Sequence, residues 1–313
     1  MKHARVVAAA LLLAATPLAL RADSAPSFEA REPVPDPDQA RFVTEDIPRF
    51  WAAFDEAADE GEPALAAALQ RLYLDPGTPG VVGFTPHRIE SAEHLAKTVL
   101  ARRAEYEAAR ANSLALGAQE AAIRAAFHRL QDLYPDAVFP DVYFVIGAMN
   151  SGGTSQPMGL IMGMEMSVNQ PATIPYLVAH EAVHYQQQFA GDRTLFNQIM
   201  IEGCADFIGK LASGGDINQE AADYARAHTR TLWTELRPHL DDEKFGNWLY
   251  VRDPAKLDGR PPDLGYAMGH LIAEAFYENA GDKQAAIRTI VECRDPRAIL
   301  DASGFDQRWR AEP

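Results

Sequence analysis

The chain has 313 residues, of which 47% are hydrophobic and 23% charged. This is an ordinary globular composition, and the length is ample for a buried core in one or two domains. The formal net charge of −15 argues against a partner that is a nucleic acid or an anionic membrane surface, because both need an excess of Lys and Arg.

The first residues have the pattern of a secretory signal peptide. The basic residues Lys2 and Arg5 precede an apolar run over 6–20, and small residues follow over 22–25. The alternative is a membrane anchor, but the run is too short to span a bilayer comfortably. We therefore expect residues 1–23 to be cleaved, no membrane span afterwards, and a periplasmic or secreted protein.

Most of the chain after the leader has helical periodicity. The pattern predicts helices over 46–59, 63–74, from Ser91 onward, 119–133, 173–190, 194–212, 217–238 and 263–279. Strand-like segments cover 141–147 and 158–166, and turn-forming residues over 150–155 predict a loop between them.

This order of elements predicts an α+β fold that is mostly α-helical, with a small β-sheet preceding the helix over 173–190. No convincing linker interrupts the chain. We therefore expect a single domain over 26–313, with a helical N-terminal part over 45–135 and a metal-site part over 141–313.

The expected helix over 173–190 carries the motif His180-Glu181-Ala-Val-His184. Thr173 is the expected N-cap, and Gly191 the expected left-handed end. Two histidines four residues apart share one helix face, so both imidazoles can reach one ion, while Glu181 is placed to take a proton from a zinc-activated water. The alternative is a solvated face that happens to carry two histidines.

A second pair of acids favours the metal interpretation. Glu202 and Asp206 lie one turn apart on the apolar face of the next expected helix. Acids on a buried face are costly unless they are paired or bound to metal. Glu202 completes a set of three ligands for one Zn²⁺, and Asp206 can accept the second N–H of a ligating histidine. Taken alone, the two acids favour the alternative of an exposed pair that caps or solvates a helix.

These motifs resemble a known group of enzymes. HEAVH followed by EGCAD is similar to the gluzincin metallopeptidases, in which a Glu on the next helix is the third ligand and an Asp follows one turn later. More narrowly, YLDPGTPGVVGF, VYFVIGAMNSGGTS and IEGCADF resemble a bacterial family of predicted zinc-dependent proteases. The resemblance extends over most of residues 45–280 and implies a zincin-like fold.

A hydrolytic site also needs a donor for the oxyanion. Similar families place a Tyr or His from a downstream helix over the metal. Tyr266 and His270 lie one turn apart on the expected helix over 263–279, with Asp263 as its expected N-cap. Tyr266 is the first candidate and His270 the second, and the alternative for Tyr266 is a core aromatic. Glu165, in the preceding strand, is expected to cap or solvate that strand.

The sequence therefore predicts a zinc-dependent metallopeptidase that acts on a peptide or protein, with Glu181 as general base. The alternative is a non-catalytic, zinc-containing periplasmic protein that binds peptides or maintains the envelope. Such a protein has no need of a base beside its ligands. Cys204 and Cys293 either form a disulfide, as exported chains often do, or are two small buried residues.

Overall fold

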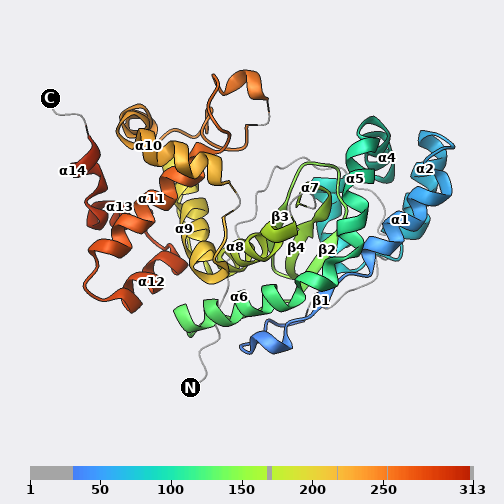
Figure 1. The fold of residues 1–313 in the computed structure, drawn as a ribbon, viewed down its shortest axis with the longest axis horizontal. Helices are drawn as coiled ribbons and strands as arrows, with labels where there is room; N and C mark the ends of the chain where they lie inside the picture. The colour runs from blue at the N-terminus through green and yellow to red at the C-terminus, as the bar shows by residue number, and fades with distance from the viewer. Residues whose placement is uncertain (1–30, 168–170, 217, 252, 311–313) are drawn as a thin grey trace, which may run out of the picture. The chain divides into compact units, whose positions relative to one another are not determined.

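The computed structural model describes residues 31–167, 171–216, 218–251 and 253–310. The expected signal peptide, residues 1–23, lies outside these ranges. The described residues divide into two compact units, one containing residues 31–118 and 139–167 and the other containing residues 119–138, 171–216, 218–251 and 253–310. The division differs from the two parts expected over 45–135 and 141–313, and the single domain stays a prediction. The mostly helical α+β fold is confirmed (Figure 1).

The first unit contains a small sheet and several short helices. Its elements are β1 (Phe42–Val43), α1 (Asp46–Ala57), α2 (Glu62–Leu69), the π-helical turn Gln70–Leu74, α3 (Pro79–Phe84), the π-helical turn Thr85–Ile89, α4 (Ala92–Ala101), α5 (Arg103–Leu114), β2 (Val142–Val145), β3 (Gly153–Gln156), β4 (Gly159–Gly163) and α7 (Met164–Ser167).

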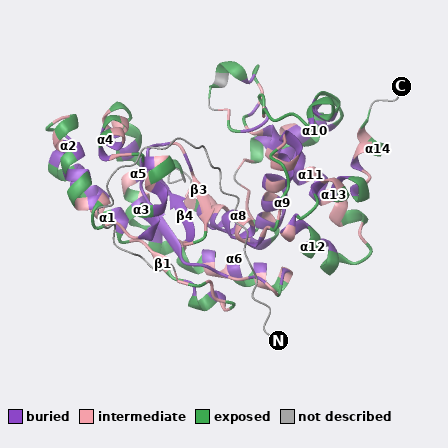
Figure 2. Ribbon diagram, turned by 180° about the vertical axis from the view of Figure 1, so that it is seen from behind, coloured by how far each residue is buried: buried purple, intermediate pink, exposed green. Residues whose placement is uncertain are grey.

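The four strands lie in the order β1-β2-β4-β3. β2 pairs in parallel with β1 and β4, whereas β3 pairs antiparallel with β4. Every residue of β2 and β4 is buried, while the edge strand β3 is half-buried throughout (Figure 2). Continuous apolar stretches such as Val142–Val145 suit inner strands, because both of their faces are covered. Helices α1 and α3 pack against β2.

Three sequence expectations in this unit need correction. The expected loop over 150–155 contains the strand β3, because its small polar residues suit a half-exposed edge. The helix that Ser91 caps is broken at Arg102, whose φ of −123° and ψ of 30° are not helical. Glu165 neither caps nor solvates a strand: it is buried in α7 and accepts hydrogen bonds from the backbone N–H groups of Gly147 and Met149 at 2.8 and 3.3 Å.

The second unit is helical. Its elements are α6 (Glu120–Leu133), the 3₁₀ turn Pro171–Thr173, α8 (Ile174–Gln186), α9 (Leu195–Ser213), α10 (Gln219–Leu236), the 3₁₀ turns Arg237–His239 and Pro254–Lys256, α11 (Leu264–Asn279), α12 (Lys283–Glu292), α13 (Pro296–Ser303) and α14 (Phe305–Trp309).

Helix α9 is the centre of the second unit. It packs against α6, α8, α11, α12 and α13, and it is therefore apolar on most of its surface. Thr194 caps its start by accepting a hydrogen bond from the Asn197 N–H at 3.3 Å, and the left-handed Gly214 ends it. Among the helices of the described residues, none has both the length and the hydropathy that a bilayer span requires.

Candidate metal centre

Helix α8 carries the first half of the site. His180 and Glu181 are buried, with relative exposures of 5% and 7%. Pro175 lies in the first turn, but Thr173, the expected N-cap, has αR geometry and its side chain makes no capping hydrogen bond. The helix ends at Gln186 rather than near Gly191, because Gln187 turns to an extended conformation (φ −60°, ψ 143°).

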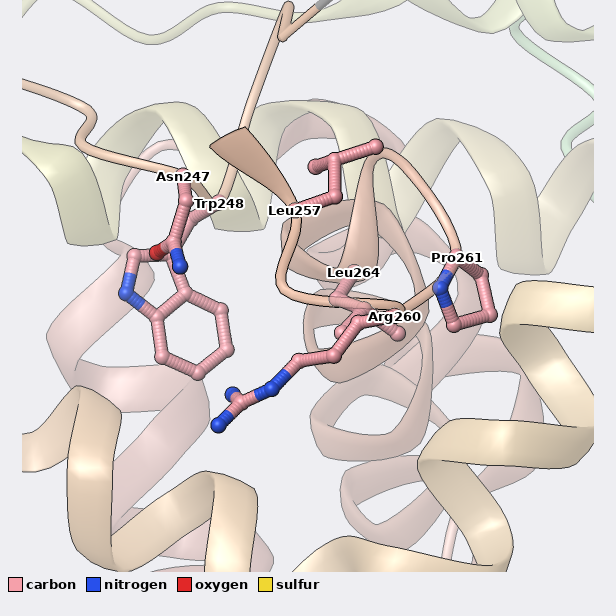
Figure 3. Close-up of a pocket in the computed structure, with 6 residues that line it drawn as sticks. All are labelled: Asn247, Trp248, Leu257, Arg260, Pro261 and Leu264. Carbon is pink, nitrogen blue, oxygen red and sulfur yellow. The ribbon is translucent and has the colours of Figure 1, made fainter. Parts of the chain in front are cut away.

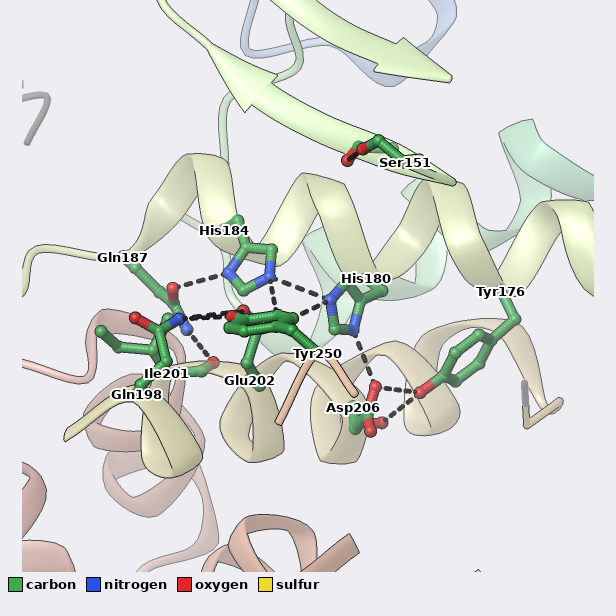
Figure 4. A network of polar contacts seen from close by, with 11 residues as sticks. Ser151, Tyr176, His180, His184, Gln187, Gln198, Ile201, Glu202, Asp206 and Tyr250 are labelled. Atoms are coloured by element: carbon green, nitrogen blue, oxygen red, sulfur yellow. Dashed lines mark hydrogen bonds and ion pairs between the residues drawn. The ribbon is translucent and has the colours of Figure 1, made fainter. Parts of the chain in front are cut away.

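Helix α9 brings Glu202 against the two histidines. The Nε2 atoms of His180 and His184 lie 2.9 Å apart. The Glu202 Oε2 atom lies 3.1 Å from the His184 Nε2 and 3.4 Å from the His180 Nε2 (Figure 4). With metal–ligand bonds of about 2.0–2.1 Å, tetrahedral zinc places neighbouring ligand atoms about 3.3–3.4 Å apart. The three atoms therefore already stand near the spacing of a zinc site.

The outer atom of each histidine ring faces a hydrogen-bond acceptor. His180 Nδ1 lies 2.8 Å from the Asp206 Oδ1, and His184 Nδ1 lies 2.8 Å from the Gln187 Oε1. The Gln187 amide is oriented by its own Nε2, which donates to the Ile201 carbonyl at 2.7 Å. Both Nδ1 atoms therefore carry a proton, and in the neutral imidazoles the Nε2 lone pairs point inward.

Two imidazole lone pairs and one carboxylate oxygen thus converge on one point. Three acceptors this close repel one another unless a cation or protons lie between them. One ligand atom from each of His180, His184 and Glu202 lies within 4.8 Å of the other two, as binding to a single metal ion requires. The donor set of two nitrogens and one oxygen fits zinc.

The electrostatics of the site also favour a positive charge. Burial alone lowers the pKa of His180, but hydrogen bonds to Asp206 and Glu202 outweigh it and hold that pKa well above the usual value. For His184, burial lowers the pKa, but the negative charge of Glu202 opposes this effect, and on balance the pKa of His184 is also raised. Burial raises the pKa of Glu202, yet the two histidines bring it well below the ordinary value.

The remaining expected residues lie around this cluster at different distances. Asp206 accepts from His180 and also from the Tyr176 hydroxyl, at 2.6 Å. The Tyr266 ring stacks beside His180, with 6.2 Å between centroids. His270 is buried and packs edge-on against Phe207 at 5.5 Å. Tyr266 is therefore at the cluster, whereas the recorded ring contact of His270 is with Phe207.

Glu181 lies beside His180 on the buried side of α8, and its negative charge raises the pKa of both histidines. Glu202 is also buried, at 7% exposure, so the alternative of an exposed acid does not hold for it.

Two glycines of α9 allow close helix packing at the site. A Cβ on Gly203 would lie 2.2 Å from the backbone of Gly269, so this glycine allows α9 to cross α11. The small residue that faces α8 is Gly209, where an added Cβ would lie 3.3 Å from the His180 backbone. Three helices, rather than two, are therefore packed closely at the site.

Four residues around the cluster were not found from the sequence. Tyr250 donates its hydroxyl to the Glu202 Oε1 at 2.6 Å, and Gln198 Nε2 donates to the same oxygen at 3.0 Å (Figure 4). The other two are Gln187 and Tyr176. Tyr176 had a signal, because it precedes His180 by one helical turn and so shares its face. Tyr250 had none, since its segment has no periodic pattern.

The two cysteines lie close together in this unit. Cys204 and Cys293 are both buried free thiols, and a side-chain hydrogen bond with Cys293 helps to raise the pKa of Cys204. Cys204 follows Glu202 by two residues, but it is not a member of the clustered ligand set. This placement agrees with the expectation that Cys204 is a packing residue.

Fold and side chains together define a candidate mononuclear centre of the His–His–carboxylate type, carried on two helices of a mostly helical chain. Residues 145–294 match the model of a family described as "Predicted Zn-dependent protease (DUF2268)". The matched region includes all three clustered residues, and over residues 145–294 it confirms the resemblance to a family of predicted zinc-dependent proteases. No significant match is found among curated proteins or among solved structures.

Proposed function

We propose that the protein is a zinc-dependent metallopeptidase with one Zn²⁺ held by His180, His184 and Glu202. The observation that carries the proposal is the convergence of two imidazole lone pairs and one carboxylate oxygen, at separations of 2.9 to 3.4 Å, beside a further buried carboxylate. Three protein ligands leave a fourth position open, which is the arrangement of catalytic rather than structural zinc.

When bound, zinc polarises both the attacking water and the scissile carbonyl. Glu181 accepts the proton that the water loses as its oxygen bonds to the carbonyl carbon. Glu181 then passes this proton to the amine nitrogen as the C–N bond breaks. The products are a carboxylate and an amine. Asp206 holds the His180 ring through Nδ1, and Gln187 does the same for His184.

Tyr266 is the proposed donor for the oxyanion. Its ring lies against His180, and burial with the charge of Glu202 holds its pKa well above the ordinary value. The hydroxyl therefore stays protonated and can donate. His270 is the second candidate, although its recorded ring contact is with Phe207.

Export to the periplasm or the medium remains part of the proposal. It is supported by the basic, then apolar, then small-residue pattern over 1–25. Peptides or proteins of that compartment are the proposed substrates.

The test compares purified wild type with Glu181→Gln on a peptide library read by mass spectrometry, at equal zinc content. Gln keeps the size of the side chain but cannot accept the proton. We expect hydrolysis by the wild type and none by Glu181→Gln. Glu220→Gln, which changes an exposed acid on α10, is the matched control and keeps full activity. If wild type and Glu181→Gln behave alike, the non-catalytic zinc protein becomes the better description.

A further inference from the structure

The two oxygens of Glu202 have different surroundings. Oε2 faces the histidine nitrogens at 3.1 and 3.4 Å. Oε1 points the other way and accepts two hydrogen bonds, from the Tyr250 hydroxyl at 2.6 Å and from the Gln198 Nε2 at 3.0 Å. Gln198 Nε2 also donates to the Tyr250 hydroxyl at 2.9 Å, so the three side chains are hydrogen-bonded to one another (Figure 4). Tyr250 also has a side-chain hydrogen bond with Tyr266.

Tyr250 belongs to a loop that is anchored immediately before it. Trp248 and Leu249 are buried, and the Trp248 carbonyl accepts a hydrogen bond from the Gly265 N–H at 2.9 Å. Trp248 lines a shallow hollow with residues that precede or begin α11 (Figure 3). The hollow has no room for a water molecule, so it is packing for the loop rather than a ligand site.

Asp263 holds the backbone of Tyr250. Its carboxylate accepts a hydrogen bond from the Tyr250 N–H at 2.7 Å, and its side chain makes no capping hydrogen bond to α11, contrary to expectation. Both residues have left-handed backbones, with φ of 63° at Tyr250 and 58° at Asp263. A left-handed conformation costs a non-glycine residue about 1–2 kcal/mol. Such strain tends to persist at functional sites.

Tyr250 as a whole residue is 44% exposed, although its hydroxyl reaches the buried Glu202. Its ring packs edge-on against Tyr266 at 6.2 Å. Burying an aromatic ring therefore does not explain why the chain accepts a strained backbone here. The hydrogen bond to Glu202 does.

We propose that Tyr250 is a positioning residue that, together with Gln198, holds Oε1 of Glu202 so that this carboxylate offers only Oε2 to the metal. This inference rests on the proposed zinc site. A carboxylate can bind a metal through one oxygen or through both. The hydrogen bonds from Tyr250 and Gln198 to Oε1 compete with binding through both oxygens. Ligation through one oxygen keeps the remaining coordination positions for water and the substrate carbonyl.

The test uses Co²⁺ as the metal, because the intensity of its visible absorption falls sharply when coordination rises above four. Wild type, Tyr250→Phe and Tyr224→Phe are loaded with one Co²⁺ each, and the affinity of each protein for Zn²⁺ is measured by competition with a chelator. Tyr224→Phe removes a phenol hydroxyl on α10, where the ring stacks on His228, and is the matched control. Circular dichroism establishes that all three are folded.

We expect Tyr250→Phe to weaken the visible bands of cobalt and to lower zinc affinity about 10-fold, the usual effect of losing a partner of a metal ligand. Asp263→Ala, which frees the Tyr250 backbone, should give a smaller change in the same direction. Tyr224→Phe should match the wild type in both measurements.

Unchanged spectrum and affinity in Tyr250→Phe overturn the inference, whatever the enzyme does to peptides. If the wild type binds zinc but hydrolyses no peptide, the proposed peptidase activity is refuted. The cobalt spectra of wild type and Tyr250→Phe then still test whether Tyr250 positions Glu202. A wild type that takes up neither metal overturns both.

Discussion

Asp206 offers the most detailed prediction from the geometry. Its Oδ1 accepts from the His180 Nδ1 at 2.8 Å and from the Tyr176 hydroxyl at 2.6 Å. Asn at this position keeps an acceptor for both donors but removes the negative charge. Ala removes the acceptor as well, and leaves two buried donors without their partner. The two variants therefore separate the charge from the orientation of the ring.

Partners of this kind typically contribute 10- to 100-fold to metal affinity, or about 1.4–2.7 kcal/mol. We expect Asp206→Asn to lower zinc affinity about 10-fold, because the hydrogen bonds remain. We expect about 100-fold for Asp206→Ala, because the ring is then free to turn and its basicity falls. Asp223→Asn removes the same charge from an exposed position on α10 and should leave the affinity unchanged.

The assay is competition for Zn²⁺ against a chromogenic chelator, with metal content measured by mass spectrometry. Apo forms of all variants are compared by urea unfolding, so that a loss of fold is not mistaken for a loss of affinity. If both Asp206 variants bind zinc within twofold of the wild type, Asp206 does not act on a metal ligand, and the role assigned to it is refuted.

Three further predictions concern stability and redox state. Burial raises the pKa of Glu165 from 4.5 to about 7. The protonated carboxyl therefore stabilises the fold by up to about 3 kcal/mol below pH 4.5, and this stabilisation is lost as the pH rises from 4.5 to about 7. The unfolding free energy measured in urea should fall with rising pH in the wild type but not in Glu165→Gln. The same pH dependence in both proteins would contradict this role of Glu165. In Gly203→Ala the added methyl group would collide with the Gly269 backbone and push α9 away from α11. We expect the unfolding free energy to fall by about 1–3 kcal/mol; unchanged urea unfolding would count against the close crossing of α9 and α11. Cys204 and Cys293 are buried free thiols, so protein denatured with an alkylating agent should carry two modified cysteines by mass spectrometry, whereas an unmodified chain two hydrogens lighter would contradict the free pair.

The sequence predicted best where a regular period carried the information. The helices α8 and α9 were expected from apolar spacing, and their spacing placed His180, His184 and Glu202 on facing surfaces. Asp206 followed from the same rule, because one helical turn separates it from Glu202. The strands β2 and β4 were found for a similar reason, as continuous apolar runs that suit the interior of a sheet.

The sequence failed where long-range contacts decide local structure. The edge strand β3 consists of small polar residues that are equally typical of a loop, and only pairing with β4 makes it a strand. Asp263 is of a residue type that favours the N-cap position, but its side chain accepts a hydrogen bond from the Tyr250 backbone instead. Tyr250 reaches Glu202 across 48 residues of sequence, and no periodic pattern connects them. Hydrogen bonds of this kind depend on how a loop folds back, which residue spacing does not report.

The most direct measurement is a titration of apo protein with Zn²⁺ while peptide hydrolysis is followed. We predict that the rate rises linearly to one zinc per chain and then stops, and that Glu181→Gln takes up the same single zinc without any hydrolysis. Activity without zinc, activity that needs a second zinc, or equal rates in the two proteins would contradict a single His180–His184–Glu202 centre with Glu181 as its base.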